Sequence, residues 1–352
     1  MKTEMIKALV GVIQSYKGRP VTLMEVCGTH TMSIAKIGLK HILPDNIRIV
    51  SGPGCPVCVT HQNYIESALL LAQSAKICTF GDLMRVPAAQ GTLAAANDVE
   101  MVYAPMDSVQ VALANPEKEV VFLSIGFETT TPAVALAVLR ARELGLQNLT
   151  FLTANKTMPA VMEALLSAPD LQVDGLIYPG HVAAIAGTEF FDALSRKHMI
   201  PGVVAGFDAA QVLVGICTLL EMIQAPTWGA ENIYKAVVKA EGNPKAQEIV
   251  RQVFEPVDAY WRGFGMIAQS GLGLRAEFSQ FDAAKKFAPL LQGMKEFEEP
   301  IGCLCGDVLK GKVSPRDCGL FGVACTPQNP VGACMVSSEG SCAAEYRYGG
   351  VL

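Results

Sequence analysis

Two hydrophobic periods alternate along the first two thirds of the chain. Eight short apolar runs, rich in β-branched residues, occur at residues 21–26, 47–51, 77–80, 99–103, 120–125, 149–153, 175–178 and 203–205. Each run ends in a turn of Gly, Pro or polar residues, and most are followed by the apolar spacing of a helix. Strands that alternate with helices are typical of parallel sheets. The pattern therefore predicts an α/β fold.

The eight units divide most simply into two similar domains, each a parallel sheet of Rossmann-like type. The break in the pattern at Asn115-Pro116-Glu117-Lys118 marks the expected boundary. We therefore predict α/β domain I at residues 20–116, with the Cys27 and Cys55/Cys58 turns, and α/β domain II at residues 117–225. A closed eight-stranded barrel is the main alternative, although several helical stretches are short for it.

Outside these units the rhythm changes. Residues 1–19 have the spacing of a short amphipathic helix, and further helices are expected near residues 231–241 and 244–253. From residue 302 onward the sequence is loop-like and rich in Cys, Gly and Pro. Such a segment is typical of a small domain organised by a metal rather than by an apolar core. We assign residues 226–352, together with the N-terminal helix at residues 1–19, to this third, metal-organised domain.

Composition and charge exclude several classes of protein. Of 352 residues, 51% are hydrophobic and 17% are charged, which indicates a folded globular chain. The formal net charge is −5 and no Lys/Arg-rich run occurs, so nucleic acid is not an expected partner. The N-terminus lacks the unbroken apolar core of a signal peptide, and the longest apolar stretch, residues 203–223, contains Asp208 and Glu221. We expect a cytoplasmic protein without a membrane span.

The chain has eleven cysteines, and in a large chain without a secretion signal they indicate metal or redox chemistry. Cys55 and Cys58 lie between a predicted strand and a predicted helix. A helix N-terminus stabilises a thiolate, so we expect a lowered pKa. Two thiols at this spacing can close a disulfide or share a metal ion, and a purely structural pair is the alternative.

The turn Cys27-Gly28-Thr29-His30 is a second candidate. A soft thiolate and an imidazole suit iron or zinc, and the same two groups can form a nucleophile–base dyad. A buried cysteine followed by a helix-capping Thr29 fits the local sequence equally well. Ligands of open parallel sheets gather at the carboxyl ends of the strands. The Cys27 turn and the Cys55/Cys58 turn are therefore expected to face one crevice.

A third candidate is the C-terminal set of thiols. Its members are separated by 12, 6 and 16 residues: Cys305, Cys318, Cys325 and Cys342. Four thiolates suit a 4Fe–4S cluster or structural zinc, and the absence of tight Cys-x-x-Cys knuckles in this set favours the cluster. Cys303 and Cys334 are alternative ligands. Cys78, in a strand, and Cys217, on an apolar helix, are expected to be packing residues.

Two polar residues that follow predicted strands each have two possible roles. His181 lies at a strand end, where it can line the crevice or bond to a helix terminus. Glu128 is either a crevice carboxylate or an ordinary acid at a helix N-terminus.

Seven motifs together resemble the HypD family of maturation proteins for NiFe hydrogenases. They occur in the family's order along almost the whole chain: EVCGTH (25–30), GPGCPVC (52–58), TFGDLMRVP (79–87), GFETT (126–130), PGHV (179–182), VAGF (204–207) and MVSSEG (335–340). Each motif alone is only modestly specific, but the combination is very hard to obtain by chance.

The resemblance implies a fold and a function. It implies two similar α/β domains and a third domain with a 4Fe–4S cluster. It also implies a complex with the small protein HypC, as a scaffold on which the Fe(CN)2CO unit of the hydrogenase is built. HypE supplies the cyanide in this family. The chain would then be a cofactor-assembly scaffold with redox activity rather than a conventional turnover enzyme.

The resemblance also implies roles for individual residues. Cys27 matches the iron-binding thiol, with His30 beside it, and Cys55 and Cys58 match a dithiol that binds iron or relays electrons. The C-terminal set matches the cluster ligands, and Glu339 matches an acid close to the last of them. Cys303 and Cys334 are then extra cysteines.

Two other functions are open at this point. One is an iron–sulfur thiol–disulfide reductase resembling ferredoxin–thioredoxin reductase, in which the cluster feeds Cys55 and Cys58. The other is a zinc-stabilised binding module without a redox role.

Overall fold

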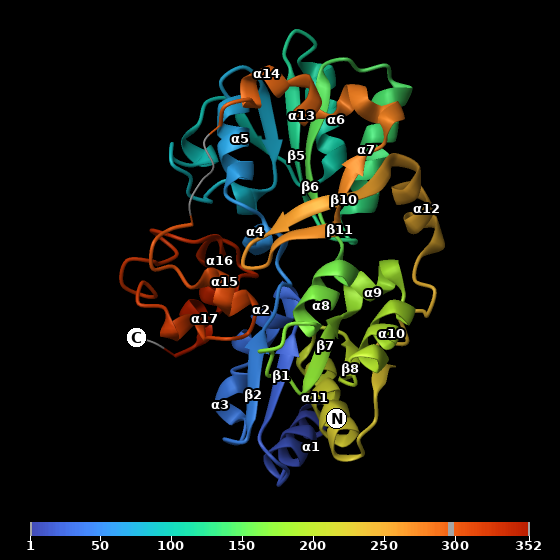
Figure 1. The fold of residues 1–352 in the computed structure, drawn as a ribbon, viewed down its shortest axis with the longest axis vertical. Helices are drawn as coiled ribbons and strands as arrows, with labels where there is room; N and C mark the ends of the chain where they lie inside the picture. The colour runs from blue at the N-terminus through green and yellow to red at the C-terminus, as the bar shows by residue number, and fades with distance from the viewer. Residues whose placement is uncertain (1, 295–298, 351–352) are drawn as a thin grey trace.

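Two parallel sheets, a hairpin between them and a C-terminal segment beside both make up the molecule (Figure 1). The computed structural model describes residues 2–294 and 299–350. Sheet A, the lower one in Figure 1, has the strand order β2-β1-β7-β8-β9. Its strands are β1 (Val21–Glu25), β2 (Ile47–Ser51), β7 (Gly175–Pro179), β8 (Pro201–Ala205) and β9 (Gly229–Asn232).

Sheet B, the upper one in Figure 1, has the order β4-β3-β5-β6. Its strands are β3 (Lys76–Thr79), β4 (Val99–Met101), β5 (Val120–Gly126) and β6 (Leu149–Asn155). All paired strands in both sheets are parallel. All eight predicted runs are strands, which confirms the α/β fold with parallel sheets and excludes the closed barrel. The seven residues of β5 are all buried, as expected for a strand covered on both faces.

The strand pairing contradicts the predicted domain boundary. β3 and β4 come before residue 116, yet they share sheet B with β5 and β6. β1 and β2 instead share sheet A with β7 and β8, which come after it, and β1 pairs directly with β7. The chain therefore crosses from sheet A to sheet B after β2 and returns after β6. The Asn115-Pro116 break is only a turn between a helix and a strand of the same sheet.

Helices cover both sheets. Those of the sheet A half are α1 (Lys2–Gln14), α2 (Gly28–Lys36), α3 (Leu39–Ile42), α8 (Met158–Leu166), α9 (Gly180–Ala186), α10 (Glu189–Lys197) and α11 (Ala209–Gln224). Those of the sheet B half are α4 (Pro56–Val59), α5 (Asn63–Leu71), η1 (Gly81–Leu83), η2 (Leu93–Ala95), α6 (Pro105–Ala114), α7 (Thr131–Glu143), α12 (Pro244–Val253), η3 (Ala276–Phe281), α13 (Ala283–Lys286) and α14 (Ala288–Leu291). No helix in the described part of the chain is long and apolar enough to span a bilayer.

The region predicted as a third domain is in fact divided among three places. Helix α1 packs on α11 of sheet A and buries Ile13, while β9 joins the same sheet. The hairpin β10 (Phe254–Trp261) and β11 (Gly265–Leu274) packs on sheet B through β6. The helix expected near 231–241 is not formed, because the side chain of Asn232 accepts from the Tyr234 N–H and donates to the Val238 carbonyl.

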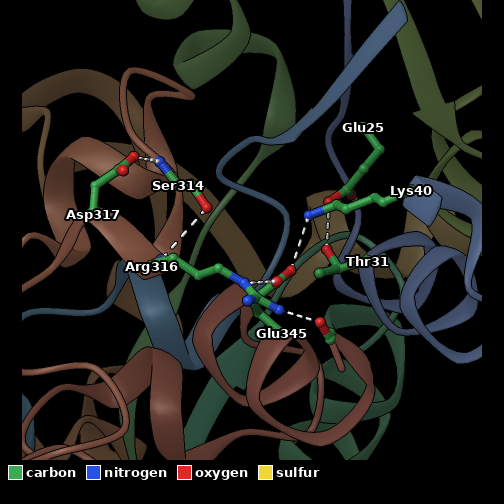
Figure 2. Close-up of polar contacts among 8 residues, drawn as sticks. Glu25, Thr31, Lys40, Ser314, Arg316, Asp317 and Glu345 are labelled. Carbon is green, nitrogen blue, oxygen red and sulfur yellow. Dashed lines mark hydrogen bonds and ion pairs between the residues drawn. The ribbon is translucent and has the colours of Figure 1, made fainter. Parts of the chain in front are cut away.

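The C-terminal segment packs beside the sheets and shares the main core cluster through Cys305, Leu309, Ala333 and Cys334. It contains α15 (Cys305–Leu309), η4 (Pro315–Asp317), α16 (Ala333–Val336) and α17 (Ser341–Tyr348), joined by loops. Glu345 of α17 accepts from Lys40 Nζ at 3.3 Å and from Arg316 Nε at 2.7 Å (Figure 2). This carboxylate therefore ties the C-terminal segment to α3 of the sheet A half.

Candidate functional site

The site lies at the carboxyl edge of sheet A, between β1 and β7. These neighbouring strands are where the chain order reverses, and ligands of open parallel sheets bind at such a point. Cys27 follows β1 and caps α2, and His181 stands in the first turn of α9 after β7. Cys27 Sγ lies 3.7 Å from His181 Nε2. His181 therefore lines the crevice, one of the two roles that the sequence left open.

His30 is beside Cys27 in sequence but its imidazole is engaged elsewhere. Its Nε2 donates to the Gly206 carbonyl at 2.9 Å, and its ring lies 4.6 Å from that of Phe207. Nδ1 is therefore the unprotonated nitrogen, and it is buried without a hydrogen-bond partner. Burial lowers the pKa of His30 to about 4. The site thus contains a neutral imidazole with an unused lone pair, which is the form that ligates metals.

The Cys27 thiol is fully enclosed. Burial raises its pKa to about 12, and the N–H of His30 at the start of α2 offsets this only in part. The charges of Glu25 and Glu339 raise the pKa further. The thiol is therefore protonated at neutral pH, and binding of a metal ion at this sulfur must release the proton.

Glu339 belongs to the Cys27 site. Thr29 Oγ1 donates to Glu339 Oε1 at 2.6 Å, across 310 positions of sequence. A Cβ at Gly28 would lie 2.5 Å from the Cβ of Glu339, and one at Gly54 would lie 2.2 Å from the Cys27 nitrogen. The two glycines therefore allow the C-terminal segment and the 52–54 loop to close on Cys27.

The Cys55/Cys58 pair is closely spaced but buried. Cys55 caps α4, and the two sulfurs are 2.8 Å apart. The expectation of a lowered pKa is wrong for Cys58, because burial raises its pKa well above the ordinary value. Helix α4 has only four residues, so the stabilisation that its N-terminus offers is small beside the loss of hydration.

The C-terminal thiols surround one apolar cavity. All six cysteines of the segment line it: Cys303, Cys305, Cys318, Cys325, Cys334 and Cys342. Cys305 Sγ lies 2.7 Å from Cys334 Sγ, and Cys342 and Cys58 are close enough to Cys334 to raise the pKa of its thiol. Sulfur donors around an apolar cavity match the chemistry that an iron–sulfur cluster requires. Within residues 2–294 and 299–350, however, no three His, Cys, Asp or Glu side chains are arranged to hold a single metal ion.

Sequence reasoning missed the position of Cys334. It was predicted to be an extra cysteine, yet it lies between the dithiol on α4 and the rest of the C-terminal set. Cys334 directly precedes the motif MVSSEG, in which the resemblance assigns a role to Glu339. This position was the one sequence signal that indicated a role for Cys334. Cys78 on β3 and Cys217 on α11 are buried in the two sheet cores, which confirms them as packing residues.

Glu128 lies at a helix N-terminus, one of the two roles considered for it, but the helix is a neighbouring one. Its Oε1 accepts from the N–H of Met158, the first residue of α8. Its Oε2 is buried and has no partner among the described residues. Burial raises the pKa of Glu128 to about 7, and the Met158 N–H offsets this only in part.

We expect Glu128 to make stability depend on pH. Between its ordinary pKa of 4.5 and about 7 the folded chain keeps a proton that the unfolded chain has lost. The free energy of unfolding should therefore fall as pH rises through this window, by ~2 kcal/mol from this residue. Urea titrations at several pH values give this free energy of unfolding. It should change less with pH for Glu128→Gln than for the parent chain.

The control for this prediction is Glu143→Gln on α7, because Glu143 is exposed and pairs only with Arg140. Its pH slope should equal that of the parent chain. If the free energy of unfolding of Glu128→Gln depends on pH as strongly as that of the parent chain, the Glu128 carboxyl is ionised in the folded chain throughout this pH window.

Comparison with known proteins gives one family across the whole chain. Residues 4–349 match the family model described as HypD: Hydrogenase formation hypA family. The hydrogenase maturation factor HypD of Rhizobium leguminosarum bv. viciae is 41% identical, over 98% of this chain and 91% of its own. The protein of the same name from Escherichia coli (strain K12) is 41% identical over 94% of this chain and 90% of its own. That of Cupriavidus necator is 39% identical over 94% and 90%. The chain therefore belongs to the HypD family of hydrogenase maturation factors.

Proposed function

We propose that this chain, together with HypC, is the scaffold on which the Fe(CN)2CO unit of a NiFe hydrogenase is assembled, with HypE as the donor of cyanide. The observation that carries this proposal is the Cys27 site. A buried thiol lies beside His181, the unused His30 Nδ1 lies in the helical turn that follows the thiol, and the Glu339 carboxylate accepts from Thr29 of the same turn. Such a crevice can hold a soft iron ion and keep water away from it.

The donor types fit the proposed cargo. Low-spin iron that carries CO and CN⁻ is soft and prefers thiolate ligands. We assign the iron to Cys27, with a cysteine of HypC as the second protein ligand. His181 is placed to accept the proton that the Cys27 thiol releases, since its ring is 3.7 Å away and burial lowers its pKa, so that it is neutral.

We assign a 4Fe–4S cluster to the C-terminal cavity, with the ligands Cys305, Cys318, Cys325 and Cys342. When bound, the cluster would supply the electrons that assembly of the iron unit requires. Cys55 and Cys58 would pass these electrons towards the crevice. The contact of Cys58 with Cys334 supports this path, because it joins the dithiol to the C-terminal set.

The burial of the dithiol argues against a thiol–disulfide reductase. The exposed fractions of Cys55 and Cys58 are 3% and 0%. A protein disulfide would have to reach these sulfurs through the surrounding core, and attack on a disulfide requires direct access. A relay within the molecule needs no such access.

Infrared spectroscopy of the chain purified anaerobically with HypC tests the proposal. We expect bands of iron-bound CN⁻ and CO in the complex when HypE is supplied. Absence of both bands, together with turnover of a protein disulfide by the chain alone, would instead support the reductase. Absence of bands in a complex that contains iron would contradict the scaffold role directly.

A further inference from the structure

The tip of the β10–β11 hairpin lies between the dithiol and the C-terminal cysteines. The Arg262 N–H donates to the Val59 carbonyl of α4 at 2.8 Å. On the other side, a Cβ at Gly263 would lie 2.7 Å from the carbonyl oxygen of Gly306 in α15. Gly263 has a φ of +83°, which favours glycine, and glycine also permits this close approach. The tip therefore joins the helix that carries Cys58 to the helix that begins at Cys305.

The Arg262 side chain is buried at this junction, with 1% of its surface exposed. Its Nη2 donates to the Thr60 carbonyl and to Gln62 Oε1, both at 3.1 Å. Its Nη1 donates to Glu299 Oε2 at 2.5 Å, and the Glu299 side chain is 39% exposed. Nε is buried and has no acceptor within the described residues. Three of the five guanidinium N–H donors are thus used for position, and the Nε–H is one of the two that are left.

The electrostatic neighbours of this guanidinium are mainly thiols. Burial alone would lower the pKa of Arg262, but interactions with Cys305, Glu299, Cys334 and Cys58 outweigh it and the pKa is raised. A buried charge is costly unless partners compensate it. Among the described residues, Glu299 is the carboxylate that Arg262 contacts, and it lies at the surface side. The guanidinium also interacts with the sulfurs of Cys58, Cys305 and Cys334, and a nearby cation favours negative charge on a sulfur.

We propose that Arg262 is a positioning residue for electron exchange between the Cys55/Cys58 dithiol and the C-terminal cysteine set. Its hydrogen bonds to Thr60 and Gln62 fix the segment after α4 to the hairpin tip, which approaches α15 through Gly263, and its charge favours negative sulfur at the junction. The inference rests on the proposed relay. It assigns a role to a residue outside every motif of the family resemblance.

The effect should appear in the reduction potential of the dithiol. Reduction breaks one S–S bond, takes up two electrons and leaves two sulfurs that hold either protons or negative charge. A nearby cation stabilises the charged product but not the neutral disulfide. Arg262 therefore favours the reduced form, and its loss should favour the disulfide.

Redox titration of the full chain in buffers of reduced and oxidised dithiothreitol measures this equilibrium. The reagent supplies the two electrons and two protons, and alkylation followed by peptide mass spectrometry gives the reduced fraction of Cys55 and Cys58. We expect Arg262→Gln to shift the equilibrium constant about tenfold towards the disulfide, which is about 30 mV for a two-electron couple. Arg262→Lys keeps the charge and should stay within about threefold of the parent chain.

Glu299→Gln gives an independent test. Because the Glu299 side chain is partly exposed, this variant should fold even if Arg262→Gln does not. Removing the acid leaves the guanidinium less neutralised, so the midpoint should move the opposite way, about twofold towards the dithiol. Arg251→Gln on α12, an exposed arginine paired with Glu248, is the matched control and should leave the midpoint unchanged.

An unshifted midpoint in Glu299→Gln, or in a folded Arg262→Gln, would overturn the proposal. So would an equal shift in Arg262→Lys and Arg262→Gln, because the charge would then have no part. The titration requires neither HypC nor iron cargo. If the complex lacks the infrared bands but the Arg262 variants shift the midpoint of the Cys55/Cys58 dithiol, the scaffold role is rejected. The role of Arg262 is then still supported.

Discussion

Replacing Cys27 with alanine is expected to remove the CN⁻ and CO bands completely from the complex with HypC. Cys27 Sγ is the one sulfur at the carboxyl end of β1, and the next group on the site side is the imidazole of His181. Alanine leaves no thiolate there, and neutral imidazole alone is a poor ligand for iron that carries CO and CN⁻. Infrared spectra and the iron content of the purified complex are the measurements.

The matched control is Cys217→Ala. Cys217 is also a buried thiol of the sheet A half, but it lies on α11 among the apolar side chains between α11 and α1. Both substitutions remove one buried sulfur, so a general loss of stability affects them alike. Full-intensity bands in Cys27→Ala would reject Cys27 as the iron anchor. Loss of the bands in Cys217→Ala as well would trace the effect to folding.

His181→Ala separates ligation from proton transfer at the same site. His181 is within 3.7 Å of the sulfur but is not the proposed ligand. We expect the bands to persist with slower loading at neutral pH and to recover speed at higher pH, where hydroxide removes the thiol proton. A complete loss at every pH would make His181 a ligand instead.

Local pattern was enough to predict the strands but not their partners. The run 120–125 is apolar except for Ser124, and such a run marks a buried parallel strand wherever it pairs. Whether β3 pairs with β2 or with β5 depends on contacts between distant segments, which a hydrophobic period does not contain. The assumption that neighbouring units share a sheet therefore placed the boundary at residue 116, although both sheets draw strands from each side of it.

The same limit applies to the site. The turns after β1 and β7 were expected at one edge because parallel strands place their carboxyl ends together. The contacts of Glu339 and Arg262 could not be predicted, since Thr29 and Glu339 are 310 positions apart, and Arg262 and Thr60 are 202 apart. His30 was the nearest imidazole in sequence, but the first turn of α2 directs its ring to Gly206, and His181 at the start of α9 faces Cys27.

Cluster binding is the second large effect that we expect, and it distinguishes the six C-terminal cysteines. All six line one cavity, so proximity alone does not select four of them. Replacement of a ligand should abolish iron, acid-labile sulfide and visible absorbance, because a cluster site with three thiolates loses the cluster or holds it weakly. We expect this loss on alanine substitution at each of four positions: Cys305, Cys318, Cys325 and Cys342.

Cys303→Ala and Cys334→Ala are the matched controls from the same cavity, and both should retain the cluster. The informative comparison is Cys305 with Cys334, whose sulfurs are 2.7 Å apart and which can exchange roles with little movement. Cluster loss in Cys334→Ala with retention in Cys305→Ala would reverse the two assignments. If Cys334 is not a ligand, its contact with Cys58 leaves it free to connect the dithiol to the cluster. Cys334→Ala should then keep its iron but reduce the Cys55/Cys58 disulfide more slowly when the cluster is the electron donor.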